Sequence, residues 1–283
     1  MEKAIAINGI TKSFGEKKVL NNITIDIQKG EIFGLLGPSG AGKTTLIKIL
    51  TGQLKAEGGN SVINGTDSQK LTGKDYSGFG IMMDDFGVYE RLSCFDNLKV
   101  FANVYGIRNE KINEALEKVG LAKAKKTPAA NLSKGMKSRL RLARVFMINP
   151  GILFLDEPTS GLDPATADEI QKMILAEKEK GKTIFLTTHT MAEAEKLCDN
   201  IALLNEGNIV EYGSPEEICR RYNHQKRIRI HLTSGEEKEI PHDENASEIV
   251  AELLKNGQAE TIHTTEPNLE TVFLELTGKE LSK

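Results

Sequence analysis

The stretch that decides the fold runs from Gly37 to Thr44 and reads GPSGAGKT. The apolar segment GEIFGLL precedes it and KTTLIKIL follows it, so the sequence predicts a strand, a glycine-rich turn and a helix. Glycines in such a turn let several backbone N–H groups face one anion, and the helix N-terminus adds a favourable dipole. We therefore predict a phosphate-binding loop, which comprises Gly37, Pro38, Ser39, Gly40, Ala41, Gly42, Lys43, Thr44 and Thr45.

Polar side chains in and beyond this loop carry the predicted chemistry. Lys43 can reach the β- and γ-phosphates of a nucleotide, and the Thr44 hydroxyl suits Mg²⁺. The segment ILFLDEP (152–158) reads as a buried strand that ends at Asp156. Alone, such an acidic pair often just ends a strand. After a phosphate loop in the same chain, it places Asp156 beside the metal ion and lets Glu157 polarise an attacking water.

The order of elements indicates a mainly parallel α/β core. Strands predicted at 30–37, 152–156 and 183–189 alternate with helices, and Asp163-Pro164 provides an N-cap and a proline that begin one of them. Residues 23–27 instead alternate between isoleucine and polar residues, the pattern of a half-buried antiparallel strand. Residues 81–150 read as mostly helical.

The character of the chain changes near residue 220. A strand at 227–232, a turn at Ser234-Gly235 and a helix over roughly 246–255 are followed by an amphipathic helix capped by Asn268. From Tyr222 onward the chain has 7 Lys/Arg against 12 Asp/Glu, so this part is acidic. We expect a small α+β appendage here.

Composition limits the classes of function. A net charge of −3 argues weakly against a protein whose main role is binding nucleic acid. The three cysteines share no metal-binding spacing, so we expect reduced thiols rather than a disulfide or metal site. No apolar run approaches the roughly 18–20 residues that span a bilayer, so we expect any membrane function to depend on a partner.

At this point the sequence resembles the ABC (ATP-binding cassette) ATPase family over residues 1 to about 220. LSKGM (132–136) stands where the family carries its LSGGQ signature, SGLD (160–163) looks like its D-loop, and His189 looks like its switch histidine. The resemblance implies a P-loop NTPase fold of ABC type, with a parallel core sheet, an antiparallel N-terminal subdomain and a helical subdomain at about 85–150. It implies an ABC ATPase domain at 1–220 and an accessory domain at 221–283.

The resemblance also implies a mechanism that uses ATP and Mg²⁺. Two copies of the chain would close around two ATP molecules, with Lys43, Glu157 and His189 as catalytic residues and Thr44 and Asp156 on Mg²⁺. Phe14 falls where the family stacks an aromatic ring on adenine, although it could be a simple core residue. Ser133 and Gly135 of one copy would contact the γ-phosphate bound by the other. Ser133 is also a fitting N-cap for a helix that begins KGMKSRL.

Two departures from the family pattern stand out. Lys134 and Met136 replace the signature's usual glycine and glutamine. Asp84 falls where the family has a glutamine near the metal, and with Asp85 adjacent the register could differ by one. An aspartate can still meet Mg²⁺ through oxygen, but it is shorter and charged.

The leading functional hypothesis is the ATP-hydrolysing subunit of a bacterial ABC exporter, located at the cytoplasmic face of the cell membrane. Its partners would be a second copy of itself and a separate transmembrane permease, and not nucleic acid. Residues 86–97, with Phe86, Tyr89 and Leu92, would form part of the permease groove or merely pack the helical subdomain. In relatives of this kind the cargo includes drugs, antimicrobial peptides and lipid-like compounds.

Two alternatives stay open at this level. One is a soluble ABC ATPase that acts on DNA or ribosomes; such relatives generally carry coiled-coil insertions or two cassettes, which this sequence lacks. The other is a module that binds ATP but barely hydrolyses it. Glu157 and His189 argue against that module, whereas Asp84 keeps it open.

Overall fold

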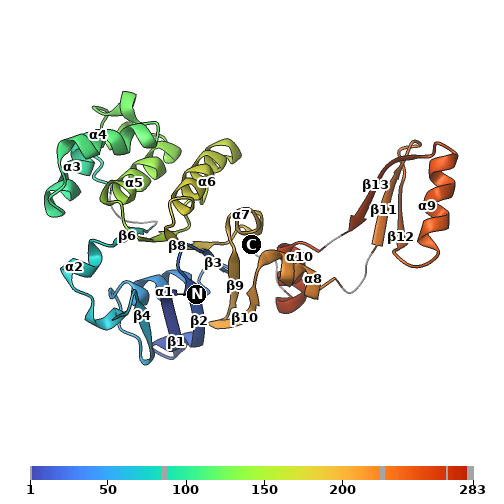
Figure 1. Ribbon diagram of the computed structural model, residues 1–283, viewed down its shortest axis with the longest axis horizontal. Helices are drawn as coiled ribbons and strands as arrows, with labels where there is room; N and C mark the ends of the chain where they lie inside the picture. The colour runs from blue at the N-terminus through green and yellow to red at the C-terminus, as the bar shows by residue number, and fades with distance from the viewer. Residues whose placement is uncertain (1, 84–87, 224–226, 266, 279–283) are drawn as a thin grey trace. The chain divides into compact units, whose positions relative to one another are not determined.

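The structure is a computed structural model that describes residues 2–83, 88–223, 227–265 and 267–278. These residues form two compact units, which divide between Tyr212 and Gly213. The first unit contains a parallel sheet that is covered on both faces, and the second is a small sheet with helices (Figure 1). Helix α8, Pro215–Arg221, belongs to the second unit, whereas composition alone suggests a change near residue 220.

A six-stranded sheet in the order β10-β9-β3-β8-β7-β6 forms the centre of the first unit. Its pairs β9/β3, β3/β8, β8/β7 and β7/β6 are parallel, as the sequence predicts for the core. The strands are β3 (Ile32–Leu36), β6 (Phe79–Met82), β7 (Ile152–Asp156), β8 (Thr183–Thr188), β9 (Asn200–Asn205) and β10 (Asn208–Gly213).

Both faces of the parallel sheet are covered, which explains the continuous apolar runs in its strands. In β7, Leu153 and Leu155 pack into a core built largely by helices, while Ile152 and Phe154 pack into the core on the opposite face. The helices of the unit are α1 (Lys43–Leu50), α2 (Gly73–Tyr76), α3 (Cys94–Val104), α4 (Asn109–Lys118), α5 (Lys134–Ile148), α6 (Pro164–Lys178) and α7 (Met191–Leu197).

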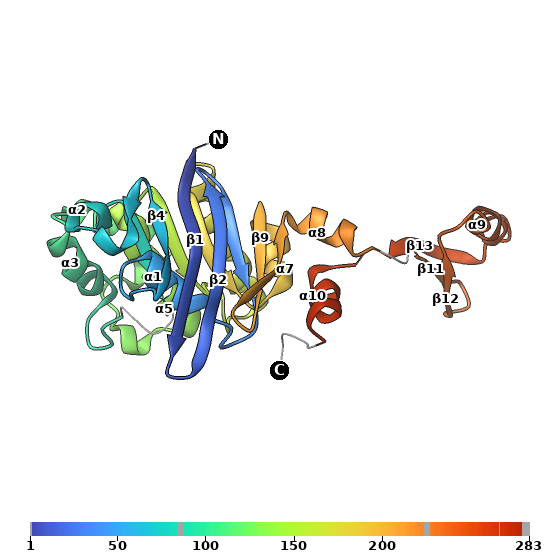
Figure 2. The ribbon, with the colours of Figure 1, turned by 90° about the horizontal axis from the view of Figure 1, so that it is seen from below.

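A four-stranded antiparallel sheet covers one of these cores and has the order β2-β1-β4-β5. Its strands are β1 (Lys3–Phe14), β2 (Lys17–Gln28), β4 (Gly58–Ile63) and β5 (Thr66–Asp67). Figure 2 shows the two long strands β1 and β2 side by side, paired from Lys3 opposite Gln28 to Phe14 opposite Lys17. Ile23, Ile25 and Ile27 point into the core, which confirms the strand predicted from their alternation.

The second unit contains a three-stranded antiparallel sheet in the order β12-β11-β13. The strands are β11 (Arg227–Leu232), β12 (Glu237–Pro241) and β13 (Ala259–Thr265), and helices α9 (Ala246–Lys255) and α10 (Leu269–Thr277) follow β12 and β13. The predicted hairpin and both predicted helices are present, and the Asn268 side chain caps α10 by accepting from Thr271 N. Strand β13 has no counterpart among the predicted strands, because AETIHTT has no clear apolar alternation.

All three cysteines are free thiols. Among the described residues, no helix combines the length and apolar character needed to cross a bilayer.

Candidate functional site

The predicted site residues of the core gather at one edge of the parallel sheet. Parallel strands place their carboxyl ends together, and in this sheet Leu36 pairs with Thr188 while Asp156 pairs with Thr187. The phosphate loop after β3, the acidic pair at the end of β7 and His189 after β8 therefore come from three distant segments to one place.

The glycine-rich loop lies against neighbouring backbone and leads directly into α1. Gly42 has a φ of +114°, and a Cβ there would lie 2.8 Å from the Val19 carbonyl oxygen. A side chain is therefore excluded both by conformation and by space. Part of the loop lines a pocket of about 160 Å³ together with Val19 and Glu157; the loop residues that line it are Ser39, Gly40, Gly42, Lys43, Thr44 and Thr45.

Lys43 is at the centre of this pocket, and its side chain is only 5% exposed. Its ammonium group donates to the Gly37 carbonyl at 2.7 Å and to the Pro38 carbonyl at 3.2 Å, and it lies 3.1 Å from Glu157 Oε1. Three acceptors match the three hydrogens of an ammonium group. A buried cation is thus held in place at the N-terminus of α1, where the helix dipole adds to the positive potential.

Asp156 is buried, and both of its carboxylate oxygens accept hydrogen bonds. Thr44 Oγ1 donates to Oδ2 at 2.8 Å, and Thr187 Oγ1 donates to Oδ1 at 2.5 Å. The hydroxyl of Thr44 and the carboxylate of Asp156 form an oxygen-only pair, which is the donor set that Mg²⁺ prefers when water and phosphate oxygens complete its shell.

Glu157 joins the phosphate loop to His189. One oxygen contacts Lys43, and the other lies 3.0 Å from His189 Nδ1. Burial raises the pKa of Glu157, but the charge and hydrogen bond of Lys43, followed by those of His189, outweigh it and lower the pKa below its usual value. The backbone of Glu157 has a φ of +47°, a left-handed conformation that costs a non-glycine residue roughly 1–3 kcal/mol.

Phe14 is the last residue of β1 and is 52% exposed, so it is not a core residue. The Lys12 ammonium lies 5.3 Å from its ring centroid. The β1–β2 hairpin that carries Phe14 also carries Val19, which lines the phosphate-loop pocket. The structure therefore places an exposed ring on the same hairpin that borders the loop.

The signature segment forms the start of α5, as the sequence predicts. Ser133 is the N-cap, and its Oγ accepts from Met136 N at 3.2 Å. Gly135 packs so closely on α6 that a Cβ would lie 2.6 Å from Thr166 Cγ2, and the Lys134 ammonium lies against Gly161 of the SGLD segment. In the described part of the chain, no hydrogen bond or ion pair joins Ser133 or Gly135 to the phosphate loop.

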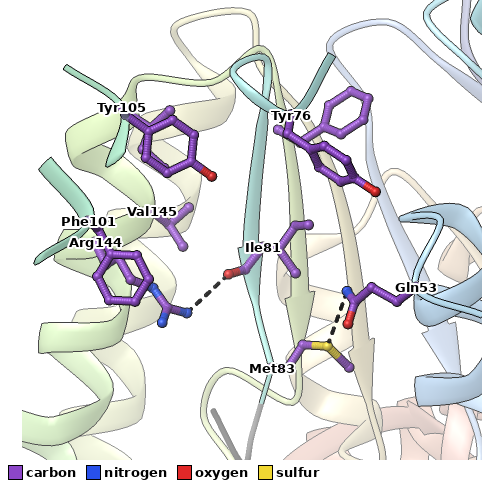
Figure 3. A pocket seen from close by; sticks show the side chains of 10 residues that line it. Gln53, Tyr76, Ile81, Met83, Phe101, Tyr105, Arg144 and Val145 are labelled. Carbon is purple, nitrogen blue, oxygen red and sulfur yellow. Dashed lines mark hydrogen bonds between the residues drawn. The ribbon is translucent and has the colours of Figure 1, made fainter. Parts of the chain in front are cut away.

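A second hollow of about 230 Å³ lies between the helical segment and the core. Figure 3 shows Phe101 of α3, Tyr105 directly after α3 and Arg144 of α5 on one side, Tyr76 on the other and Ile81 of β6 between them. The Arg144 guanidinium stacks 4.7 Å from the Phe101 ring centroid and donates to the Ile81 carbonyl at 3.2 Å. Aromatic and apolar side chains thus line the hollow, called the aromatic groove below, around the Arg144 guanidinium.

The residues predicted to form part of a permease groove, or to pack the helical subdomain, do not line this hollow where the structure describes them. Tyr89 is 51% exposed and Leu92 is partly buried, but the hollow is lined by Phe101 and Tyr105 further along the helical segment. Phe86 and Asp84, the candidate metal ligand, lie outside the described residues.

No local sequence pattern predicts the place of several residues in the site. Val19 reaches the phosphate loop only through the β1–β2 hairpin. Thr187 reads as one polar residue in a buried strand, yet it donates to Asp156. Thr159 and Glu193 are bonded to each other although they are far apart in sequence.

Comparisons with known proteins agree with this geometry. A family model described as ABC transporter matches residues 20–160. The chain is 37% identical to a fluoroquinolones export ATP-binding protein of Mycobacterium tuberculosis, over 99% of this chain and 95% of that protein. This chain belongs to the ABC transporter family. It is an ATP-binding subunit of that family, and its fold is the ABC-type ATPase fold.

Other members of the ABC transporter family are similarly close. The chain is 36% identical to the lantibiotic transport ATP-binding protein SrtF of Streptococcus pyogenes, over 78% of this chain and 96% of that protein. It is 31% identical to the linearmycin resistance ATP-binding protein LnrL of Bacillus subtilis, over 96% and 97%. Among solved structures, cbiO1 from Clostridium perfringens, part of the ABC transporter complex cbiONQ, matches with a TM-score of 0.69 and 26% identity, over 77% and 91%.

Proposed function

We propose that this ABC subunit is a Mg²⁺-dependent, homodimeric ATPase that powers an exporter through a separate permease at the cytoplasmic face of a membrane. The observation that carries the proposal is the chain of contacts from Lys43 through Glu157 to His189, next to the Thr44–Asp156 pair. It brings a phosphate-binding cation, a general base and an orienting histidine to one pocket edge.

In this proposal Lys43 holds the β- and γ-phosphates, and Glu157 accepts the proton of the attacking water. His189 keeps the Glu157 carboxylate oriented, because it contacts the oxygen that Lys43 does not. The pKa of Glu157 is lowered, so its carboxylate is ionised near neutral pH and can act as a base. The protein thus contributes mainly positioning and charge stabilisation.

Mg²⁺ fits the residues beside the loop. Thr44 and Asp156 would hold it, and the ion would supply positive charge to the phosphate oxygens as they become more negative. Asp84 remains a proposed third ligand.

The position of the signature supports the proposed homodimer. Ser133 and Gly135 are at the N-terminus of a 15-residue helix, and among the described residues neither makes a bond to the phosphate loop of its own chain. A second copy facing the first would bring this helix to the γ-phosphate, as the family resemblance implies. Closure would then depend on an intact triphosphate, which links hydrolysis to motion.

The aromatic groove supports a permease partner. It is lined by apolar rings around Arg144, and exposed Val104 and Tyr105 lie at the end of α3 beside it. Such a groove suits a short amphipathic helix that presents an apolar face. We propose drugs, antimicrobial peptides or lipid-like compounds as the cargo, since the relatives' names refer to fluoroquinolones, a lantibiotic and linearmycin.

Steady-state ATP hydrolysis by the purified chain tests the enzymatic part. We expect turnover that needs Mg²⁺ and falls by about 10²–10⁴-fold in Glu157→Gln, the usual contribution of a general base. Equal turnover in the presence of excess chelator, or in the variant, would contradict the proposed mechanism.

A further inference from the structure

A buried carboxylate lies just behind the catalytic loop, and the mechanism above does not use it. Glu193, in the first turn of α7, is 2% exposed. Its Oε1 accepts from Thr159 Oγ1 at 2.6 Å. Its Oε2 is buried and has no hydrogen-bond partner in the part of the chain that the structure describes. A carboxylate with one unsatisfied buried oxygen costs folding free energy, so Glu193 is a poor choice for stability alone.

The hydrogen bond between Thr159 and Glu193 links the loop that carries Glu157 to the helix that follows His189. Thr159 follows Glu157 by two residues on the same loop, and α7 begins directly after His189 and Thr190. The two segments that carry Glu157 and His189 are therefore joined between these side chains at 3.0 Å and again through Glu193 and Thr159. These contacts add to the hydrogen bond from Glu157 N to the Thr187 carbonyl at 3.1 Å.

The same loop is held from a third side by the signature helix. Ser138 of α5 is buried and donates to the Pro158 carbonyl at 3.0 Å. The segment from Glu157 to Thr159 is thus bonded to the phosphate loop through Lys43, to α5 through Pro158 and to α7 through Thr159. Because Glu157 has the left-handed backbone conformation, its loop needs such contacts to keep the carboxylate in place.

We infer that Glu193 is a positioning residue for ATP hydrolysis. Its hydrogen bond to Thr159 fixes the loop that presents Glu157 to water. The same bond makes this loop move together with α7, the helix that follows His189. The inference rests on the proposed ATPase mechanism. It predicts an effect on the chemical step rather than on nucleotide binding, since neither Glu193 nor Thr159 lines the phosphate-loop pocket.

The test compares two substitutions at Thr159. Thr159→Val has nearly the same shape but cannot donate, whereas Thr159→Ser keeps the hydroxyl. We expect Thr159→Val to lower kcat by at least about tenfold, with KM and ATP affinity within about twofold of the wild type, because small displacements of a catalytic group are costly. Thr159→Ser and Glu193→Gln, which keep a donor and an acceptor, should retain most of the activity.

Further measurements separate positioning from mere stability. Glu195→Ala, an exposed glutamate two residues along α7, is the matched control and should leave kcat unchanged. Circular dichroism reports whether each variant is folded, and the double variant Thr159→Val/Glu193→Gln should lose little more than Thr159→Val alone. Wild-type kcat in folded Thr159→Val would overturn the inference. Glu157→Gln, assayed beside it, tells the two ideas apart: if Glu157→Gln is inactive and Thr159→Val is not, only the inference fails.

Discussion

Lys43 Nζ lies 3.1 Å from Glu157 Oε1, so the two side chains that the mechanism needs most are bound to each other. The remaining hydrogens of the ammonium group point to the Gly37 and Pro38 carbonyls. A phosphate oxygen can contact Lys43 only by replacing one of these three acceptors. If it replaces Glu157, ATP binding releases the carboxylate toward water and removes the contact that contributes most to lowering its pKa.

This exchange predicts opposite effects of two substitutions on ATP affinity. Glu157→Gln removes a charged competitor for Lys43, so we expect ATP to bind at least as tightly as in the wild type. Lys43→Ala removes the buried cation and should weaken binding by tenfold or more, since hydrogen bonds to charged groups contribute about 1.5–3 kcal/mol. Titration with labelled ATP measures both. Unchanged affinity in Lys43→Ala would count against the phosphate-loop assignment.

Phe14 should contribute to affinity through the base of the nucleotide. Its ring is 52% exposed at the end of β1, and stacking of a base on an aromatic side chain contributes about 1–3 kcal/mol. We therefore expect Phe14→Ala to weaken ATP binding by roughly 30-fold, which corresponds to about 2 kcal/mol, the middle of that range. Phe14→Tyr keeps the ring and serves as the control. Equal ATP binding by Phe14→Ala would remove Phe14 from the site.

Glu177 should make stability depend on acid pH. It is fully buried on α6 and contacts Lys118 of α4, Lys180 at 2.7 Å and Lys182 at 2.5 Å. Burial raises the pKa of Glu177, but the hydrogen bonds of the lysines outweigh burial and lower the pKa from 4.5 to about 2. A lowered pKa stabilises the folded protein fully above the unfolded value near 4.5, and this stabilisation is lost as the pH falls toward 2.

We accordingly expect Glu177→Gln to reduce the free energy of unfolding at neutral pH by an amount on the order of 3 kcal/mol. The difference from the wild type should shrink at pH 3. Urea-unfolding midpoints measured by circular dichroism report it, and Glu179→Gln, an exposed neighbour, is the control. If the difference in unfolding free energy stayed constant across this pH range, the contacts of Glu177 with the three lysines would not be the cause of the lost stability.

Tyr105 should matter for the permease and not for the nucleotide. It lines the aromatic groove directly after α3, and tyrosines that become buried in an interface are common hot spots worth about 2 kcal/mol or more. We expect Tyr105→Ala to reduce permease recovery while ATP affinity stays unchanged. Leu254→Ala, an exposed leucine on α9, is the control and should affect neither. Full permease recovery with Tyr105→Ala would place the docking surface elsewhere.

The sequence predicted best where one local pattern implies one local structure. The loop before α1, the apolar strand that ends at Asp156 and the caps at Ser133 and Asp163 are all present, because each depends on neighbours along the chain. The groove and the Glu193–Thr159 bond were not predictable in this way. Their residues come together only through packing of distant helices and loops, and no spacing in the sequence encodes that packing.

If this ATPase powers a membrane transporter, its permease should be recovered together with it. We would first pull down tagged Glu157→Gln protein from detergent-solubilised native membranes with ATP and Mg²⁺ present. We expect one polytopic membrane protein in roughly stoichiometric amount, lost when Tyr105→Ala is added. Recovery of ribosomes or DNA, or of no partner at all, would rule out a transporter role and favour a soluble ABC ATPase.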